Sequence, residues 1–173
     1  MSETAALILT VSLIAVGSAV VFYLQHLAQK RRKTLAKEQS ERYSRRLDNP
    51  DFGALETYFR HPLPDPLKAL YRDKSRINSE NILVDVPNPG ESESTSFIAF
   101  FEPLDRESVR HPWPGCEKLL PFANNGLGDM FMIDPTQPDP EVLYYLHENR
   151  TLVGLGVTMS KFLTAPYRPQ SDE

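Results

Sequence analysis

Cysteine and histidine are the residues of this chain best suited to nucleophilic or metal chemistry, and both are scarce. The 173 residues include one cysteine and four histidines. Cys116 could act as a nucleophile with His111 or His147 as its base if the fold brought two of them together. A structural thiol is the simpler interpretation, because free cysteine commonly behaves as a small hydrophobic residue. A single thiol also excludes an internal disulfide, which suits a reducing cytosol.

Motifs for metal and phosphate binding are missing from the sequence. His147-Glu148 is not followed by the second histidine of a zinc-binding helix, and a zinc site needs three or four ligands. The stretch at residues 125–128 contains two glycines but lacks the lysine of a phosphate-binding loop. We therefore expect no metal, no cofactor and no catalytic residue.

One turn stands out, because a carboxylate interrupts an apolar strand directly after it. Asn-Gly favours a tight hairpin turn, and Asp129 follows at once. We expect Asp129 to bind the backbone amides of the turn, and a carboxylate of a functional site is the alternative. The residues assigned to this structural turn are Asn125, Gly126, Gly128 and Asp129.

The charge of the chain is strongly polarised. From residue 47 onward, eleven Lys and Arg face twenty Asp and Glu, a formal net charge of −9, whereas residues 30–46 carry +6. An acidic domain repels nucleic acid and attracts basic proteins. We therefore expect a protein partner, and no nucleic acid, at the acidic loops. The predicted partner-binding residues are Glu91, Glu93, Asp134, Asp139 and Glu141.

The element that must place this acidic domain in the cell is a hydrophobic segment at residues 5–24. It contains no charged residue, and a helix of twenty residues covers the roughly 30 Å hydrocarbon core of a bilayer. A basic run follows it on one side only, which predicts an outside N-terminus and a cytoplasmic remainder. Anionic lipid head groups are the expected partners of that run. Its residues are Lys30, Arg31, Arg32 and Lys33.

These signals divide the chain into four parts. We predict a tail and transmembrane helix over residues 1–24, and a basic helical stalk over 25–48 that ends at Asn49-Pro50. One domain follows over 49–167, with a short tail over 168–173. The soluble part, about 127 residues long, is near the usual size of one domain.

Apolar spacing predicts an α+β domain in which helices pack on an antiparallel sheet. Two short helices begin at the cap signals Asn49-Pro50 and Asp65-Pro66. Residues 97–101 are apolar on both faces, which suits a central strand, and Thr158 can cap a final helix. The remaining predicted strands cover residues 82–86, 119–122, 127–133, 142–146 and 152–157.

The C-terminal half resembles the SUKH superfamily, a domain shared by fungal regulators of cell-wall synthesis and many bacterial immunity proteins. Residues 119–129 look like the family's signature of strand, turn, Gly-Asp and strand. Residues 142–148 are similar to its next strand, and residues 155–163 to its closing strand and helix. Upstream, residues 63–71 resemble its early helix, so the resemblance covers roughly 52–167.

The resemblance implies a non-enzymatic protein-binding domain, since many bacterial members neutralise toxins, often nucleases, by binding them. The first hypothesis is a membrane-tethered immunity protein that occludes a basic toxin. The second is a membrane-tethered scaffold or regulator of the cell envelope. The third, an unrecognised enzyme, has no constellation of polar residues to support it.

Overall fold

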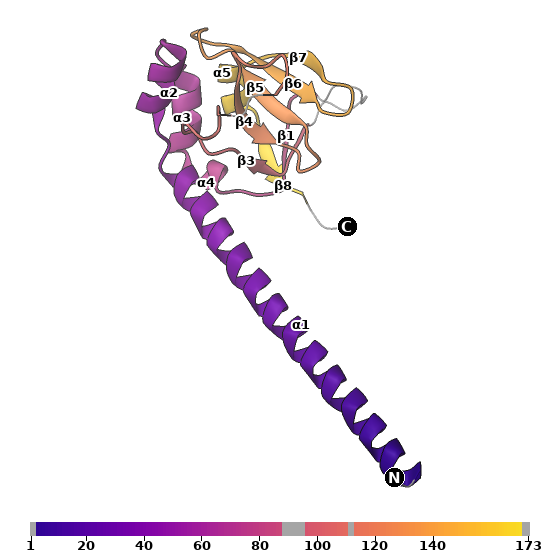
Figure 1. Cartoon of the computed structure of the whole chain (residues 1–173). Coiled ribbons are helices and arrows are strands. Elements are labelled where there is room, and N and C mark those ends of the chain that lie inside the picture. Colours follow the sequence, from indigo (N-terminus) through magenta and orange to yellow (C-terminus); the bar gives the residue numbers. More distant parts are fainter. Residues whose placement is uncertain (1–2, 88–95, 111–112, 171–173) are drawn as a thin grey trace. The chain divides into compact units, whose positions relative to one another are not determined.

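The computed structural model describes residues 3–87, 96–110 and 113–170, with side chains from residue 22 onward. Its contacts define two compact units, residues 1–42 and 43–173. Helix α1 (Glu3–Asp48) makes up the first unit and contributes its last six residues to the second (Figure 1).

No helix in the part of the chain with described side chains is long and apolar enough to cross a membrane. Most of the predicted membrane span, residues 5–21, lies outside that part.

Three short helices follow α1, and their first turns show how they begin. The carboxylate of Asp51 accepts a hydrogen bond from the Ala54 amide at 3.0 Å, so Asp51 caps the first of them in place of the predicted Asn49. The third was not predicted, and it begins where Asp73 accepts a bond from the Arg76 amide at 3.3 Å. The three are α2 (Phe52–Phe59), α3 (Asp65–Arg72) and α4 (Lys74–Ile77).

The strands of the described residues form two antiparallel sheets (Figure 1). The smaller sheet has the order β2 (Ser96–Ile98), β1 (Ile82–Val84), β8 (Tyr167–Pro169). The larger sheet has the order β3 (Phe100–Phe101), β4 (Leu120–Asn124), β5 (Met130–Ile133), β6 (Glu141–Leu146), β7 (Thr151–Thr158). Helix α5 (Met159–Thr164) follows β7, and its predicted cap is confirmed, since the Thr158 hydroxyl accepts a bond from the Lys161 amide.

The prediction of one central strand over residues 97–101 is wrong, because the chain changes sheets at Ala99. The Ala99 amide donates to the carbonyl of Asn124 in the larger sheet at 2.8 Å. Its carbonyl accepts a bond from the Asn81 amide, next to the smaller sheet, at 2.9 Å. Strands β2 and β3 therefore lie at the edges of different sheets.

The Asn-Gly sequence does not form a tight hairpin turn. Strand β4 ends at Asn124 and β5 begins at Met130, so five residues connect them. Residues 127–129, predicted as part of a strand, belong to this connection. The backbone amides of Leu127 and Asp129 bond to the Asn125 side chain instead of to the neighbouring strand.

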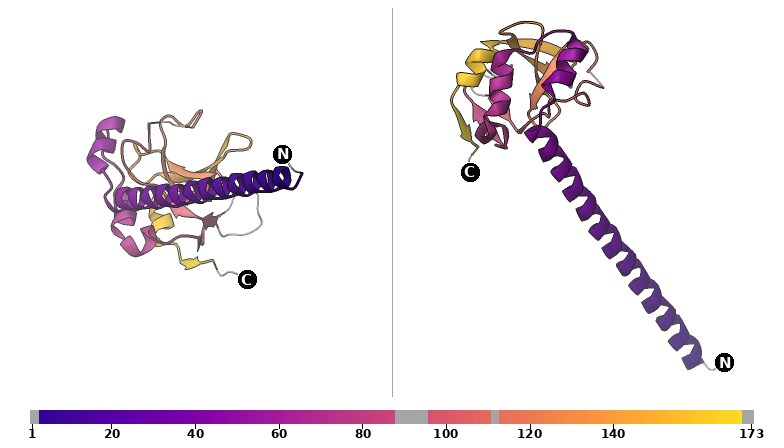
Figure 2. Two further views of the ribbon diagram at one scale, coloured as in Figure 1. Left: turned by 60° about the horizontal axis from the view of Figure 1, so that its bottom comes forward. Right: turned by 90° about the vertical axis from the view of Figure 1, so that its left-hand side faces the viewer.

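The larger sheet is covered on both faces. Along β5, Phe131 and Ile133 belong to the main core with the helices, whereas Met130 and Met132 belong to a second apolar cluster. This alternation follows from the two-residue period of a strand. In the right-hand view of Figure 2 the short helices lie in front of the strands. The second cluster consists of Cys116, Met130, Met132 and Tyr145, with Trp113 and Leu119 packed against it.

A buried arginine joins α4 to the end of α5. The Arg76 guanidinium donates to the carbonyls of Leu163 at 2.5 Å and Phe162 at 3.0 Å, and it lies 4.8 Å from the centre of the Tyr167 ring. Burial lowers the pKa of Arg76. The last carbonyls of a helix lack a partner within the helix. Arg76 therefore supplies a donor to the Leu163 carbonyl and a second donor to the Phe162 carbonyl, which also accepts a bond from the Ala165 amide at 3.3 Å.

Candidate functional site

The predicted acidic residues at the β5–β6 connection hold neighbouring elements in place. Asp139 accepts a hydrogen bond from the Ser160 amide in the first turn of α5, at 2.8 Å. Glu141, at the start of β6, accepts one from the Gly156 amide of β7 at 2.9 Å. Both side chains belong to exposed residues, so each carboxylate combines a structural bond with accessible negative charge.

The third described member of the set, Asp134, organises its own turn. Its Oδ1 atom accepts bonds from the Thr136 amide at 2.9 Å and the Thr136 hydroxyl at 2.7 Å. Because β5 and β6 are antiparallel neighbours, this connection places all three acids at one end of the larger sheet. We call residues 134–141 the acidic loop. Glu91 and Glu93 lie outside the described residues.

At the other end of the sheet, Asn125 organises the connection between β4 and β5. Its side-chain oxygen accepts bonds from the amides of Leu127 at 2.9 Å and Asp129 at 3.1 Å. This is the role that the sequence pattern assigned to Asp129. An asparagine at the start of such a connection can bind amides two residues on, so the signal was present in the sequence.

Asp129 instead ties this connection to the turn between β6 and β7. Its Oδ1 atom accepts a bond from the His147 amide at 2.9 Å and lies 2.8 Å from His147 Nδ1. Its Oδ2 atom accepts bonds from the side-chain nitrogen of Asn125 at 2.9 Å and from the Tyr144 hydroxyl at 3.2 Å. Burial alone would raise the pKa of Asp129, but these hydrogen bonds outweigh it and lower that pKa.

The glycine before Asp129 is required by both its backbone and its surroundings. Gly128 has a φ of +110°, and a Cβ atom there would lie 3.1 Å from the His147 ring. L-residues rarely adopt such a backbone, and the ring leaves little room for a side chain. Gly128 therefore permits the close approach of the two turns.

A carboxylate beside a histidine can orient a general base, so we searched for a nucleophile that it could serve. The Cys116 thiol belongs to the second apolar cluster, and burial followed by the charge of Glu117 raises its pKa, which disfavours the reactive thiolate. His111 lies outside the described residues. In the part of the chain that the structure describes, no group of three or more His, Cys, Asp or Glu could hold a metal ion. The Asp129–His147 pair is best understood as a link between two turns.

Comparison with known protein families identifies the fold. A match to the SMI1/KNR4 family (SUKH-1) covers residues 47–165. The chain belongs to this family. No match was found among curated proteins or among solved structures.

The SMI1/KNR4 match begins within the last turn of α1, and the packing of that turn explains why. Leu47 is 6 % exposed and belongs to the main core. The Tyr43 hydroxyl donates to the carbonyl of Phe101 in β3. The apolar residues at positions 43 and 47 lie on one face of a helix, and this spacing was the available signal that the predicted stalk ends inside the domain.

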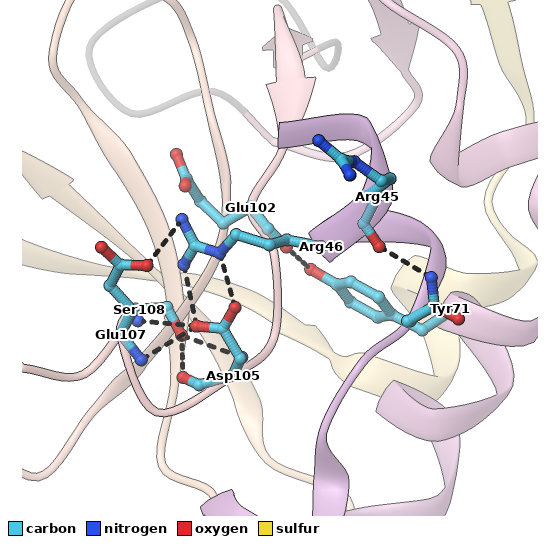
Figure 3. Close-up of polar contacts among 8 residues, drawn as sticks. Arg45, Arg46, Tyr71, Glu102, Asp105, Glu107 and Ser108 are labelled. Atoms are coloured by element: carbon cyan, nitrogen blue, oxygen red, sulfur yellow. Dashed lines mark hydrogen bonds and ion pairs between the residues drawn. The ribbon is translucent and has the colours of Figure 1, made fainter. Parts of the chain in front are cut away.

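Arg46, counted in the sequence as part of the basic stalk, is bound within the SMI1/KNR4 domain (Figure 3). Its Nε and Nη2 atoms donate to the two carboxylate oxygens of Asp105 at 2.6 and 2.8 Å, and its Nη1 atom lies 3.3 Å from Glu107. Burial alone would raise the pKa of Asp105, but the bonds from Arg46 and from the amides of Glu107 and Ser108 lower it. Arg46 thus fixes the last turn of α1 to the loop after β3.

A partly buried carboxylate, Glu102, lies beside this pair. Burial raises its pKa, although a bond from the Asn124 side chain at 2.5 Å and the nearby charge of Arg46 oppose that shift. Its backbone carbonyl accepts a bond from the buried Tyr71 hydroxyl, as Figure 3 shows. Glu102 is a residue of the domain interior that sequence reasoning did not identify.

The basic run at residues 30–33 lies in the first unit, on α1, and all four of its residues are exposed. Exposure is what binding to anionic head groups requires, and that binding stays a prediction.

Proposed function

We propose that this chain is an immunity-type protein that neutralises a toxin by binding it directly, without catalysis. The observation that carries the proposal is the SMI1/KNR4 match over residues 47–165, because this family consists generally of non-catalytic immunity and regulatory proteins. The domain would act by covering the toxin's working surface.

The charge of the domain supports a basic toxin. A formal charge of −9 from residue 47 onward attracts a positively charged protein over long distances and speeds its encounter. In the acidic loop, Asp139 and Glu141 stay exposed while they bind amides. An ionised carboxylate has about four acceptor positions. Glu141, which binds the Gly156 amide, and Asp139, which also accepts bonds from the Thr158 and Ser160 side chains, can therefore still contact a partner.

We further propose that residues 5–24 anchor the protein in a membrane with the domain in the cytosol. The uncharged segment and the one-sided basic run support this placement. The anchor also favours a second candidate function, that of a tethered scaffold or regulator of the cell envelope, because such a partner would be concentrated at the same surface.

Capture followed by a neutralisation assay tests the proposed function. The full-length chain, in mild detergent, is used as bait in a lysate at low and high salt, since about 1 M salt shortens the screening length to about 3 Å. The captured protein is purified, and its toxic activity is measured with and without the bait. We expect salt-sensitive capture of one basic protein whose activity is lost in the complex. Capture of envelope proteins without toxic activity would support the second candidate instead.

The acidic loop needs variants that remove charge and keep the structural bonds. In the triple variant Asp134→Asn, Asp139→Asn and Glu141→Gln, each amide oxygen can still accept the bond to its backbone amide. The matched control removes equal charge elsewhere through Asp65→Asn, Glu80→Gln and Glu117→Gln. We expect the first variant to weaken toxin binding more than the control. Equal effects of the two would show that only the overall charge matters.

The anchor is tested separately by membrane fractionation. We expect the full-length chain to remain with membranes after carbonate washing, and a variant lacking residues 1–24 to be released. A protease added outside the cell should leave the domain intact. Release of the full-length chain by carbonate would contradict the anchor without affecting the binding proposal.

A further inference from the structure

The edges of the two sheets differ in how well they are protected. An edge strand exposes unpaired backbone groups, and proteins usually blunt it with short length, charge or proline. Strand β3 has two residues, β2 has three, and β8 has three that include Arg168 and Pro169. Strand β7, at the other edge of the larger sheet, has eight residues without a charge or a proline.

Strand β7 is also accessible. Thr151, Leu152, Gly154 and Gly156 are exposed, whereas every residue of β4 and β5 is buried. Its partner strand is β6 alone (Figure 1). Within the described chain, no backbone hydrogen bond joins residues 151–158 to a segment on the opposite side of β7.

The regular part of this edge is its first half. Pairing with β6 runs in register from Thr151 opposite Leu146 to Gly154 opposite Leu143, and then shifts at a bulge. Gly156 has a φ of +68°, so the second half departs from strand geometry. We call residues 151–154 the edge segment.

The edge segment adjoins the acidic loop. A Cβ atom at position 154 would collide with Glu141 Oε1, so this carboxylate lies directly against the edge segment. The same carboxylate binds the Gly156 amide at 2.9 Å. Negative charge therefore lies beside the backbone donors and acceptors of the edge segment, of which the Thr151 amide donates to the Asn149 side chain at 3.1 Å.

We propose that the edge segment docks an extended stretch of a basic protein partner, which adds to the larger sheet as a sixth strand. Backbone hydrogen bonds would supply the affinity, and alternate side chains the specificity. The charge of −9 selects the occupant, since it repels a second copy of this chain and attracts a basic segment. The identity of that partner as a toxin rests on the proposed function.

Synthetic peptides test the edge segment without the natural partner. The probe is an eight-residue peptide of alternating valine and lysine, and its matched control carries N-methyl groups on two amides of one edge. Binding to the full-length chain is measured by fluorescence anisotropy and hydrogen exchange. We expect the probe to slow exchange of alternate amides in residues 151–154. Each methyl group should weaken binding about fivefold, because it removes one hydrogen bond.

Single-residue variants show where on the protein the peptide binds. Glu141→Gln and Leu152→Lys should each weaken probe binding about fivefold, because the first removes a favourable charge and the second adds a repulsive one. Leu127→Lys is the matched control, since Leu127 is the more exposed leucine, at 77 % against 39 % for Leu152, and lies in the β4–β5 connection. It should leave probe binding unchanged.

Three results would overturn the edge proposal. They are equal binding of the methylated and unmethylated peptides, protection of amides outside β7 only, and concentration-dependent dimerisation of the chain through β7 in sedimentation. The proposal can fail separately from the proposed function. Neutralisation of a toxin without protection of β7 refutes the edge segment alone, whereas peptide docking without neutralisation refutes the immunity role alone.

Discussion

Replacing Arg46 by methionine should destabilise the domain by about 2 kcal/mol, because its ion pair with Asp105 is neither fully exposed to solvent nor fully buried. Two of its bonds are short, at 2.6 and 2.8 Å, and the two side chains are 27 % and 19 % exposed. An exposed ion pair contributes about 0.2 to 1 kcal/mol, whereas breaking a buried one costs about 3 to 5 kcal/mol. Methionine keeps the packing of the aliphatic stem, so the loss reports on the polar bonds.

A double-mutant cycle isolates the pair. Asp105→Asn removes the charge but keeps an oxygen for the amides of Glu107 and Ser108, which donate to Asp105 Oδ1 at 2.9 and 3.2 Å. We expect a coupling energy of about 1 to 1.5 kcal/mol at pH 7. The pKa of Asp105 lies below its ordinary 3.8 in the folded protein. The coupling is therefore complete above that ordinary value and is lost as the pH falls through the folded pKa.

Urea unfolding of the full-length chain measures these differences. The only tryptophan, Trp113, packs against the second apolar cluster, so its fluorescence reports on the domain. Lys37→Met is the surface control, because Lys37 is 79 % exposed and lies 3.8 Å from its partner Glu41. It should change stability by less than about 0.5 kcal/mol. A coupling below about 0.3 kcal/mol at pH 7 would show that the ion pair does not hold the last turn of α1 to the loop after β3.

The same urea experiment tests three further variants. Glu102→Gln should stabilise the domain by about 1 kcal/mol at pH 7. Burial raises the pKa of Glu102 above 4.5, so ionisation of the wild-type carboxylate costs stability as the pH rises. The advantage of glutamine should therefore vanish near pH 4, where Glu102 is protonated. Gly128→Ala should cost about 2 kcal/mol and its control Gly115→Ala about 1 kcal/mol. Both glycines have a positive φ, but an added Cβ atom would contact a side chain, that of His147, only at Gly128. Arg76→Ala should cost about 3 kcal/mol, because the Leu163 carbonyl loses the guanidinium donor and the Phe162 carbonyl keeps only the Ala165 amide, at 3.3 Å. Equal stability would mean that water replaces the guanidinium.

Local patterns in the sequence were sufficient for the elements that depend on their own residues. Apolar spacing predicts α2, and apolar spacing with a cap signal predicts α5, because a helix satisfies its backbone within a few residues. Strand β8 was missed because only its partner β1 makes it a strand. The change of sheets at Ala99 was missed for the same reason, since it depends on bonds to Asn124 and Asn81, which are distant in the sequence.

The candidate site shows the same division. Composition predicts an acidic surface, but it cannot distinguish a carboxylate that is available to bind a partner from one that stabilises the fold through hydrogen bonds. Asp139 and Glu141 each bind an amide 15 or more residues away, and Arg46 binds Asp105 across 59 residues. Such pairs leave no local signal, because each residue alone looks like an ordinary surface charge.

This sharing of roles constrains how the binding surface can change. A carboxylate that only attracted a partner could be replaced at little cost to folding. Glu141 cannot, because its loss would free the Gly156 amide at the bulge that ends the regular part of β7. Gly156 is exposed and water can reach its amide, so the lost bond costs about 0.5 to 1.5 kcal/mol. Charge beside the edge segment and the geometry of that segment are therefore maintained by the same side chain, and specificity for a new partner would have to arise at Leu152 and its neighbours instead.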